Sequence, residues 1–418
     1  MDTEHSAPLI DQPPAKVEIR QHQGGFSLFR DGVPFFVNGA GGCERIEELA
    51  ASGANSVRTW GIEQTQDILP TLRKTDLTLC SGHWLEPPRR GFDYADEAAV
   101  AEQLERIKRE VLAIKDEPNL LLWGVGNELE LGTGSDPDVW RAVEEVARFI
   151  KRVDGLHPVM TVLASADEAS LKAIETLCPS LDLVGINSYG DISRVQPALD
   201  AIGWSRPYLI TEWGSNGAWE VEKTDWGAEL EPTSTEKAGQ IRYRYQFIGS
   251  SDSRCLGSYV FLWGNKQETT HTWYGLFTPE GRATEGVFAI SSQWKEQLGD
   301  GSCPKISAFR VNGSSPSASL KVASKESLLA EVEWTSPEEE DPEIVWSLRR
   351  ESCDKRLGGD LEEAAAVLST VFVKDAIGTV RFDAPMQSGP YRLFVEIRGE
   401  ANTVATANFP FWVDKELS

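Results

Sequence analysis

Short apolar runs alternate with longer amphipathic segments between residues 35 and 297. An apolar run of four to eight residues is typical of a strand buried on both faces, and such strands belong to parallel sheets. Eight such runs, with helical patterns between and after them, are typical of a (β/α)8 barrel, which needs about 250 residues. The expected strands are Phe35–Gly39, Asn55–Trp60, Leu77–Trp84, Leu120–Val125, Pro158–Leu163, Leu183–Asn187, Tyr208–Glu212 and Ser258–Trp263.

Helical periodicity fills the intervals between these runs, and a short hairpin precedes the first of them. The hairpin is indicated by Asp31-Gly32, a pair that favours a tight turn between strands. A doubly wound open sheet is the main rival fold, but no dinucleotide or phosphate-binding glycine motif follows an early strand. The expected helices are Glu44–Ala51, Thr65–Lys74, Asp96–Ile114, Asp138–Val153, Asp167–Leu177, Ser234–Phe247 and Glu285–Gln297.

The pattern changes after residue 298 to short alternating segments separated by turn residues. About seven such strands predict an all-β sandwich of immunoglobulin or fibronectin type, with Trp334, Trp346 and Trp412 turned into its core. We therefore expect a loose segment at 1–16, a barrel domain at 17–302 and a sandwich at 303–418. The expected sandwich strands are Leu320–Val322, Leu328–Trp334, Ile344–Arg349, Val367–Val373, Thr379–Phe382, Tyr391–Arg398 and Ala405–Val413.

The net charge of the chain argues against some classes of binding partner. Its 41 basic and 65 acidic residues give a formal net charge of −24. Nucleic acids and anionic membrane surfaces both require a positive footprint, so neither is an expected partner, whereas a neutral sugar is compatible. No signal-peptide pattern or long apolar stretch is present. We expect a soluble protein, extracellular or periplasmic if a signal peptide has been removed and otherwise cytoplasmic; the oligomeric state is not indicated.

Two of the expected strands lead directly to a glutamate. The fourth is followed by Asn127-Glu128, and the seventh ends in Glu212. Because the carboxyl ends of parallel strands open onto one crevice, the two carboxylates would face each other. Two opposed carboxylates are sufficient to cleave a glycosidic bond, since one donates a proton to the leaving oxygen while the other attacks the anomeric carbon or activates water. This chemistry needs no cofactor.

Further polar and aromatic residues stand at the ends of other expected strands. They occur in the order Arg58, His83, Asn127, Glu128, Tyr189, Glu212 and Trp263. Over about residues 17–298 the chain therefore resembles clan A of the retaining glycoside hydrolases. In that clan an Asn-Glu pair closes the fourth barrel strand and carries the acid/base, and a glutamate closing the seventh strand is the nucleophile.

The resemblance implies Glu128 as the acid/base and Glu212 as the nucleophile of a retaining β-glycosidase. Arg58 and Tyr189 would bond Glu212, keeping it ionised and aimed. Asn127 would bond the 2-hydroxyl of the sugar, an interaction that strengthens in the transition state. The full set of expected substrate-binding residues is Arg58, Trp60, His83, Trp84, Asn127, Asn187, Tyr189, Trp213, Trp263 and Trp273.

Alternatives to these roles remain open from the residues alone. Glu130 lies two positions after Glu128 and is a rival for the acid. Arg58 is also compatible with a structural ion pair, and His83 with a hydrogen-bonded wall of the pocket. Some of the tryptophans contact sugar and others only pack, although Trp263 is expected to form the floor under the sugar. No metal site is proposed.

Within the clan, the barrel is similar to that of family 2 hydrolases, although their long amino-terminal sandwich domains are missing. A barrel followed by an immunoglobulin-like domain resembles the family 158 endo-β-1,3-glucanases, and there is a weaker likeness to fungal-type β-1,3-glucanosyltransferases. These resemblances imply a β-glucan substrate. The alternatives are a transglycosylase using the same residues, a carbohydrate-binding barrel without catalysis, and a cell-surface adhesion module in which the sandwich is the working part.

Overall fold

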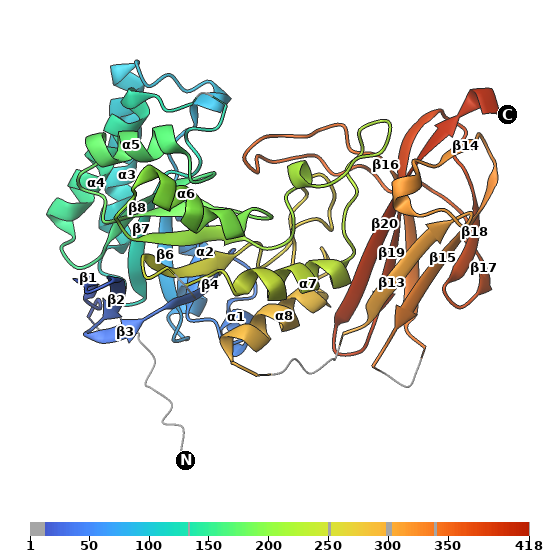
Figure 1. Cartoon of the computed structure of the whole chain (residues 1–418), viewed down its shortest axis with the longest axis horizontal. Helices are drawn as coiled ribbons and strands as arrows, with labels where there is room; N and C mark the ends of the chain where they lie inside the picture. The colour runs from blue at the N-terminus through green and yellow to red at the C-terminus, as the bar shows by residue number, and fades with distance from the viewer. Residues whose placement is uncertain (1–12, 133, 250–251, 298–302, 338–340, 418) are drawn as a thin grey trace, which may run out of the picture. The chain divides into compact units, whose positions relative to one another are not determined.

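The computed structural model describes residues 13–132, 134–249, 252–297, 303–337 and 341–417 (Figure 1). Most of the expected loose segment at 1–16 lies outside these residues. The chain divides into two compact units. The first comprises Met1–Trp213 and Arg244–Trp263, and the second comprises Gly214–Tyr243 and Gly264–Ser418. The domain boundaries expected from the sequence remain a prediction.

The first unit contains the closed parallel barrel that the alternation of apolar runs predicts. Neighbouring strands follow the order of the chain, and the last strand, β11, pairs with the first, β4, to close the sheet. The barrel is therefore confirmed and the open-sheet rival is excluded. Its strands are β4 (Val37–Gly41), β5 (Ser56–Arg58), β6 (Thr78–His83), β7 (Leu120–Val125), β8 (Val159–Leu163), β9 (Leu183–Asn187), β10 (Tyr208–Trp213) and β11 (Cys255–Val260).

The first and last barrel strands differ from the expected ranges. Phe35 still belongs to the hairpin, where it pairs with Leu28, so the first barrel strand begins only at Val37. The last strand begins at Cys255 and ends at Val260, so Trp263 lies in the loop beyond it. Apolar residues precede β4 and follow β11, so the hydrophobic pattern alone misplaced the start of the first strand and the end of the last.

Aspartates begin three of the helices of the first unit. The side chains of Asp96, Asp136 and Asp167 accept hydrogen bonds from the first free N–H groups of α3, α4 and α5, and a carboxylate there also favours the helix dipole. Helix α6 was not expected from the sequence. The helices are α1 (Ile46–Ala51), α2 (Ile62–Leu72), α3 (Glu97–Ile114), α4 (Pro137–Val153), α5 (Glu168–Leu177) and α6 (Val195–Ile202).

A three-stranded antiparallel sheet precedes the barrel, formed by β1 (Val17–His22), β2 (Gly25–Arg30) and β3 (Val33–Phe35). Asp31 and Gly32 have φ angles of 50° and 79°, as the expected tight turn requires. The buried side chains of Val17 and Leu28 join the cluster that fills the barrel interior. Because backbone N–H groups of this sheet also bond loops that lead into barrel strands, the sheet covers the end of the barrel opposite the strand carboxyl ends.

The second unit joins two long loops to the carboxy-terminal strands. It contains α7 (Ser234–Tyr245) except its last two residues, and α8 (Glu285–Trp294). Two antiparallel sheets form the expected β-sandwich, with the orders β20-β19-β16 and β13-β15-β18-β17. Two short strands, β12 (Ala283–Thr284) and β14 (Lys321–Ala323), pair with β20. The long strands are β13 (Lys305–Val311), β15 (Ser327–Thr335), β16 (Glu343–Arg350), β17 (Val373–Ala376), β18 (Thr379–Asp383), β19 (Gly389–Arg398) and β20 (Thr403–Asp414).

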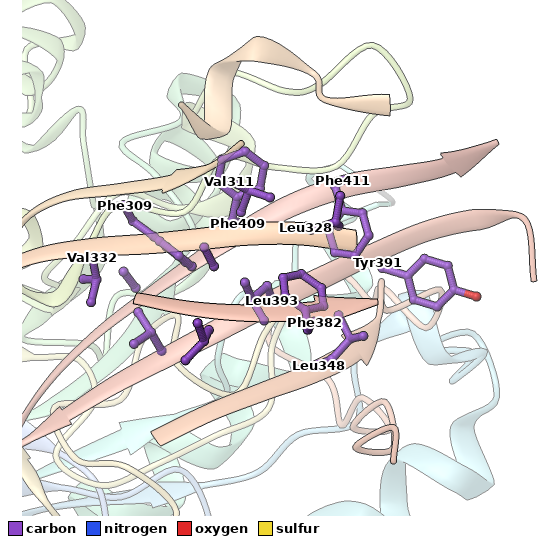
Figure 2. Packing of buried hydrophobic residues seen from close by; sticks show 14 of the residues in the cluster. Phe309, Val311, Leu328, Val332, Leu348, Phe382, Tyr391, Leu393, Phe409 and Phe411 are labelled. Carbon is purple, nitrogen blue, oxygen red and sulfur yellow. The ribbon is translucent and has the colours of Figure 1, made fainter. Parts of the chain in front are cut away.

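Alternate residues of these strands meet in the sandwich core (Figure 2). Phe309, Phe409 and Phe411 are among its aromatic members, and Trp334 and Trp346 pack against it while partly buried. Trp412 was expected in the core but is not a member of it. It follows Phe411 on β20, and successive side chains of a strand point to opposite faces, so its ring instead lies 6.0 Å from that of Trp226.

One expected strand is wrong. Residues 367–372 form no ladder, apart from an isolated bridge between Val367 and Arg349, and the strand β17 begins only at Val373. Val367, Val371 and Val373 are exposed, whereas Leu368 and Phe372 are partly buried against the sandwich core. The alternation that indicated a strand is therefore real, but the segment forms no ladder with a neighbouring strand. Among the described residues, no helix is both long and apolar enough to cross a membrane.

Candidate active site

Four strand ends of the barrel bring polar side chains to one buried centre in the first unit. Arg58 is the last residue of β5, and Asn187 is the last residue of β9. Glu212 is the penultimate residue of β10, where the pairing with β9 shifts register between Ile210 and Glu212. A bulge of this kind re-aims the side chains that follow it, and bulges are frequent next to active sites. Glu128 lies three residues beyond the end of β7.

The Glu212 carboxylate accepts three hydrogen bonds. Its Oε1 atom is 2.9 Å from Arg58 Nη1 and 2.9 Å from Trp60 Nε1, and its Oε2 atom is 3.0 Å from the Tyr189 hydroxyl. Arg58 also donates to Asn127 Oδ1 at 2.7 Å and to the Thr211 carbonyl at 2.9 Å. A guanidinium and two further donors surround the buried carboxylate and hold it in one orientation.

Trp60 reaches Glu212 because two glycines make room for it. A Cβ atom on Gly41 would stand 2.8 Å from the Trp60 ring, and one on Gly82 would stand 2.6 Å from the Trp60 backbone. Any larger residue at either position would displace the indole. Trp60 was expected to touch sugar, but the structure gives it a bond to a candidate catalytic carboxylate and leaves part of its surface exposed.

A strained turn carries Glu128. The preceding Gly126 has a φ of 73°, and Glu128 itself has a φ of 51°, in the left-handed region that non-glycine residues rarely adopt. Three bonds fix this turn: the Glu128 N–H donates to the Val162 carbonyl at 2.9 Å, Arg89 donates to the Glu128 carbonyl at 2.7 Å, and Thr161 donates to the Val125 carbonyl at 2.8 Å. Non-glycine strain of this kind clusters at functional sites.

The surroundings of the Glu128 carboxyl favour its protonated form. Burial and the negative charge of Glu212 raise its pKa well above the usual range, against the lowering effect of a 2.7 Å hydrogen bond from Asn187. Asn187 is oriented in turn by Thr211, whose hydroxyl donates to Asn187 Oδ1 at 2.7 Å. The two glutamates are therefore in opposite environments, and that contrast is what an acid and a nucleophile require.

Glu130 is a second buried carboxyl on the same turn. Its Oε1 atom accepts the Ala164 N–H at 2.6 Å, while its Oε2 atom is buried without a hydrogen-bond partner. Burial raises the pKa of Glu130 to about 7. The pKa values of Glu128 and Glu130 are both raised, so the pKa alone does not show which of them is the acid. Glu128 is the one that is bonded to Asn187 and acted on by the charge of Glu212.

His83 lies entirely below the surface. Its ring is 0% exposed, lies 5.2 Å from the Trp123 ring, and has Nδ1 3.0 Å from Glu110 Oε2. The other ring nitrogen has no hydrogen-bond partner. This placement agrees with the pocket-wall alternative, and a contact between His83 and substrate remains a prediction.

The remaining tryptophans differ in exposure. Trp84 is half-buried, with the Arg90 guanidinium 5.1 Å from its ring centre, and so still has surface to offer a ligand. Trp213 is fully buried, and Trp263 is 1% exposed with its indole N–H 3.3 Å from the Arg45 carbonyl. Trp273 belongs to the second unit, where it is buried and donates to the Asn216 carbonyl. Sugar contacts by these three remain predictions that their burial does not favour.

Sequence reasoning missed several residues that support this centre. Thr211, which orients Asn187, sits next to Glu212 in the chain, and the spacing gave no sign of its role. Arg89 binds the Glu128 backbone from the 3-10 turn Pro88–Arg90 after β6. Two arginines in a loop after a barrel strand were a usable signal, because such loops form the functional face of the fold.

Known proteins resemble this chain in fold, but no match is found from its sequence. The chain matches no known family model and no curated protein. Its structure is similar to a β-D-glucuronidase of Dictyoglomus thermophilum, with a TM-score of 0.53, 15% identity and 68% of this chain covered. It is also similar to an FMN-binding β-glucuronidase from Facaelibacterium prausnitzii L2-6, with a TM-score of 0.54, 13% identity and 96% of this chain covered. A third similar structure is β-glucuronidase 2 of Bacteroides uniformis, with a TM-score of 0.52, 12% identity and 95% of this chain covered.

The chain spans about half the length of these structures, at 54%, 59% and 48% respectively. At these identities the likeness concerns the fold alone. It agrees with the barrel and sandwich described above.

Proposed function

We propose that this protein is a retaining β-glycoside hydrolase that acts on an oligo- or polymeric β-glucan, with β-1,3 linkages favoured. One observation carries the proposal. Two buried glutamates at the ends of the fourth and seventh barrel strands have opposite environments, Glu212 beside Arg58 and two other donors, and Glu128 with a raised pKa. That is the pairing that double displacement requires.

In the proposed reaction, the Glu212 carboxylate attacks the anomeric carbon while Glu128 gives its proton to the departing glycosidic oxygen. The product is a glycosyl ester on Glu212 and a free alcohol. Glu128, now ionised, takes a proton from water as that water attacks the same carbon, which releases the sugar with its original configuration and restores both carboxyls. No other group takes part in the proton balance.

The neighbours of the two glutamates have assigned tasks in this proposal. Arg58 holds Asn127 by its oxygen, which directs the amide NH2 group away from the guanidinium and makes it available to a sugar 2-hydroxyl. Asn187 and Tyr189 fix the two carboxyls, and the partly exposed rings of Trp60 and Trp84 supply apolar surface for a pyranose.

The structural neighbours add support for the covalent step and raise a question of substrate. The Bacteroides uniformis β-glucuronidase 2 structure is described as covalently bound to a cyclophellitol-6-carboxylate aziridine. The net charge of −24 favours a neutral glucan over a polymer of uronic acids, because like charges repel at long range. A panel of β-1,3-, β-1,4- and β-1,6-glucans, with an aryl β-glucoside and an aryl β-glucuronide, tests this preference.

The roles are tested by exchanging each glutamate for alanine. Glu128→Ala should still form the glycosyl-enzyme from substrates with good leaving groups, and azide should rescue its second step and give a β-glycosyl azide. Glu212→Ala should lose turnover on every substrate. Retention is checked by following the anomeric proton of the first product by NMR. If azide rescues only Glu212→Ala and gives an α-azide, the roles are exchanged, and an inverted first product excludes the mechanism.

A transglycosylase is the second candidate, because it uses the same residues and differs only in the acceptor. It is favoured if products longer than the substrate accumulate at high glucan concentration. A carbohydrate-binding barrel without catalysis is supported only if the panel shows binding and no cleavage.

A further inference from the structure

A small pocket in the second unit is lined by basic side chains, although the whole chain carries a formal net charge of −24. Arg349, Arg350, Arg392 and His271 line it together with one acidic residue, Glu351. The pocket encloses about 240 Å³, part of which is open to solvent. Every lining residue belongs to the second unit, so the pocket is a feature of that unit alone.

The charge of Arg392 is already balanced. Its guanidinium donates to both carboxylate oxygens of Glu351, at 2.9 and 2.8 Å, and the two side chains are only 1% and 6% exposed. It also donates to Asn408 Oδ1 at 2.7 Å and to the Glu229 carbonyl at 2.9 Å. Arg392 and Glu351 therefore neutralise each other, and the remaining arginines determine the charge of the pocket.

Arg349 has no such partner. Its guanidinium donates to the Ala365 carbonyl at 2.8 Å, and its Nε atom is buried without a hydrogen-bond partner. Among the residues that the structure describes, no carboxylate forms an ion pair with it, and Glu280 and Glu396 act on its charge only from a greater distance. Arg350 is exposed, so water solvates its charge, whereas an unpaired charge that is half-buried is costly. Arg349 is thus the group whose charge a ligand would balance.

Two neutral side chains of the pocket also have hydrogen-bonding capacity to spare. His271 is 8% exposed, and its ring lies 4.6 Å from the Phe394 ring but forms no hydrogen bond with any described residue. Burial and the charge of Arg349 lower the pKa of His271 to about 4, so the ring is neutral at neutral pH and offers one N–H donor. The side-chain amide of Gln267 likewise forms no hydrogen bond within the described part of the chain. Buried polar groups are normally paired, so this concentration of unpaired donors indicates a binding site.

The loop that carries His271 is strained where it lines the pocket. Thr269 has a φ of 63°, which a β-branched residue rarely adopts. Its N–H donates to the Glu362 carboxylate at 2.6 Å, and Glu268 and Thr270 exchange two backbone hydrogen bonds around it, at 3.1 and 2.7 Å. Strain of this kind is retained mainly at ligand-binding and active sites, which agrees with a binding role for the loop.

We infer that this pocket binds the carboxylate of a small organic acid, with Arg349 balancing its charge and His271 and Gln267 donating hydrogen bonds. The planar guanidinium matches the planar carboxylate. One uncompensated arginine requires one negative charge, which favours a carboxylate over a phosphate monoester with about two. The ligand is small, because a drug-sized molecule occupies about 300–1,000 Å³. The inference is independent of the proposed function, since it uses no residue of the candidate active site.

The test uses sodium acetate as the probe, added to the full chain at neutral pH and followed by the NMR signals of the His271 imidazole, which His271→Asn identifies. We expect a saturable shift with a Kd of about 1–10 mM, the affinity of a small, weakly held anion. Arg349→Met should weaken this binding about tenfold or more, because charge-assisted hydrogen bonds are lost, and Arg349→Lys should retain part of it. Arg381→Met is the matched control. It removes an exposed arginine that is paired with Asp375, and it should bind acetate as the wild type does.

Two further probes identify the source of the carboxylate. D-Glucuronate should bind and D-glucose should not, because they share a ring and differ in the carboxylate. Tighter binding of glucuronate than of acetate would identify an acidic sugar, and equal binding a general site for small carboxylates. A response to glucose or to sodium chloride as large as that to acetate, a shift that does not saturate, or equal affinities in Arg349→Met and Arg381→Met would overturn the inference. If Arg349→Met does not fold, Gln267→Ala decides: it should weaken acetate binding about twofold to tenfold, the range of one neutral hydrogen bond, and unchanged binding would count against the site.

Discussion

At the scale of residues, the proposed chemistry depends on which carboxyl carries a proton before the reaction begins. A general acid must begin protonated, and the raised pKa of Glu128 keeps its proton in place at neutral pH. The sequence pointed to both glutamates and Arg58 because each lies at or just beyond the end of a barrel strand in a recognisable motif. It favoured Glu128 over Glu130 only through the Asn-Glu motif, because the pKa values of the two carboxyls depend on burial and on charges from other strands.

The pH profile should separate these two carboxyls. The basic limb of kcat/KM reports loss of the proton from the acid, so activity falls as the pH rises through the pKa of that group. The ionised Glu130 raises the pKa of Glu128, so Glu130→Gln should move the basic limb to lower pH by about half a unit to one unit, with the plateau retained. Glu168→Gln, which changes an exposed carboxylate, should leave the profile unchanged. Loss of all activity in Glu130→Gln would make Glu130 the acid.

At the scale of elements, the sequence predicted the strands and helices that have a regular hydrophobic period and missed those in which the period is interrupted. All eight barrel strands were expected, because strands buried on both faces are continuously apolar. Helix α6 was missed because Pro197 interrupts its short pattern. Strand β13 was missed because a register shift between Ile306 and Ala308 disturbs its alternation. The turn after β7 also has no periodicity, although its Gly-Asn-Glu motif marked it as functional.

That turn should respond strongly to a change at Gly126. Alanine there would have a positive φ, which costs about 1–2 kcal/mol, and its Cβ would stand 2.7 Å from the Leu129 side chain. The turn must then shift, and Glu128 with it. We expect Gly126→Ala to lower kcat/KM on the order of 100-fold, the scale of a misplaced catalytic group. Gly155→Ala is the matched control, since its Cβ would meet nothing within 4 Å. Equal kinetics for the two variants would contradict this account.

At the scale of the whole molecule, the sandwich is more than an appended domain. The second unit unites its strands with the loops after β10 and β11 through a buried polar network. Glu231 accepts hydrogen bonds from Lys237, Thr272 and Asn408, at 2.5, 2.8 and 2.6 Å. Arg392 of β19 donates to Asn408 and to the Glu229 carbonyl. Nothing in the sequence indicated this network, because the bonds from Asn408 to Glu231 and from Arg392 to Glu229 join residues more than 150 positions apart.

Breaking the central ion pair of this network should destabilise the protein without altering its chemistry. The side chains of Lys237 and Glu231 are 9% and 1% exposed, so Lys237→Met leaves a buried carboxylate uncompensated. Loss of one partner of a buried pair costs about 3–5 kcal/mol. Lys223→Met is the matched control, because Lys223 is half exposed and its partner Glu229 keeps Lys355; its cost should be about 1 kcal/mol or less. Urea unfolding measures both free energies.

Because the candidate catalytic residues belong to the first unit, the preferred glucan linkage should stay the same in both variants. A Lys237→Met protein as stable as Lys223→Met would show that the network does not stabilise the second unit.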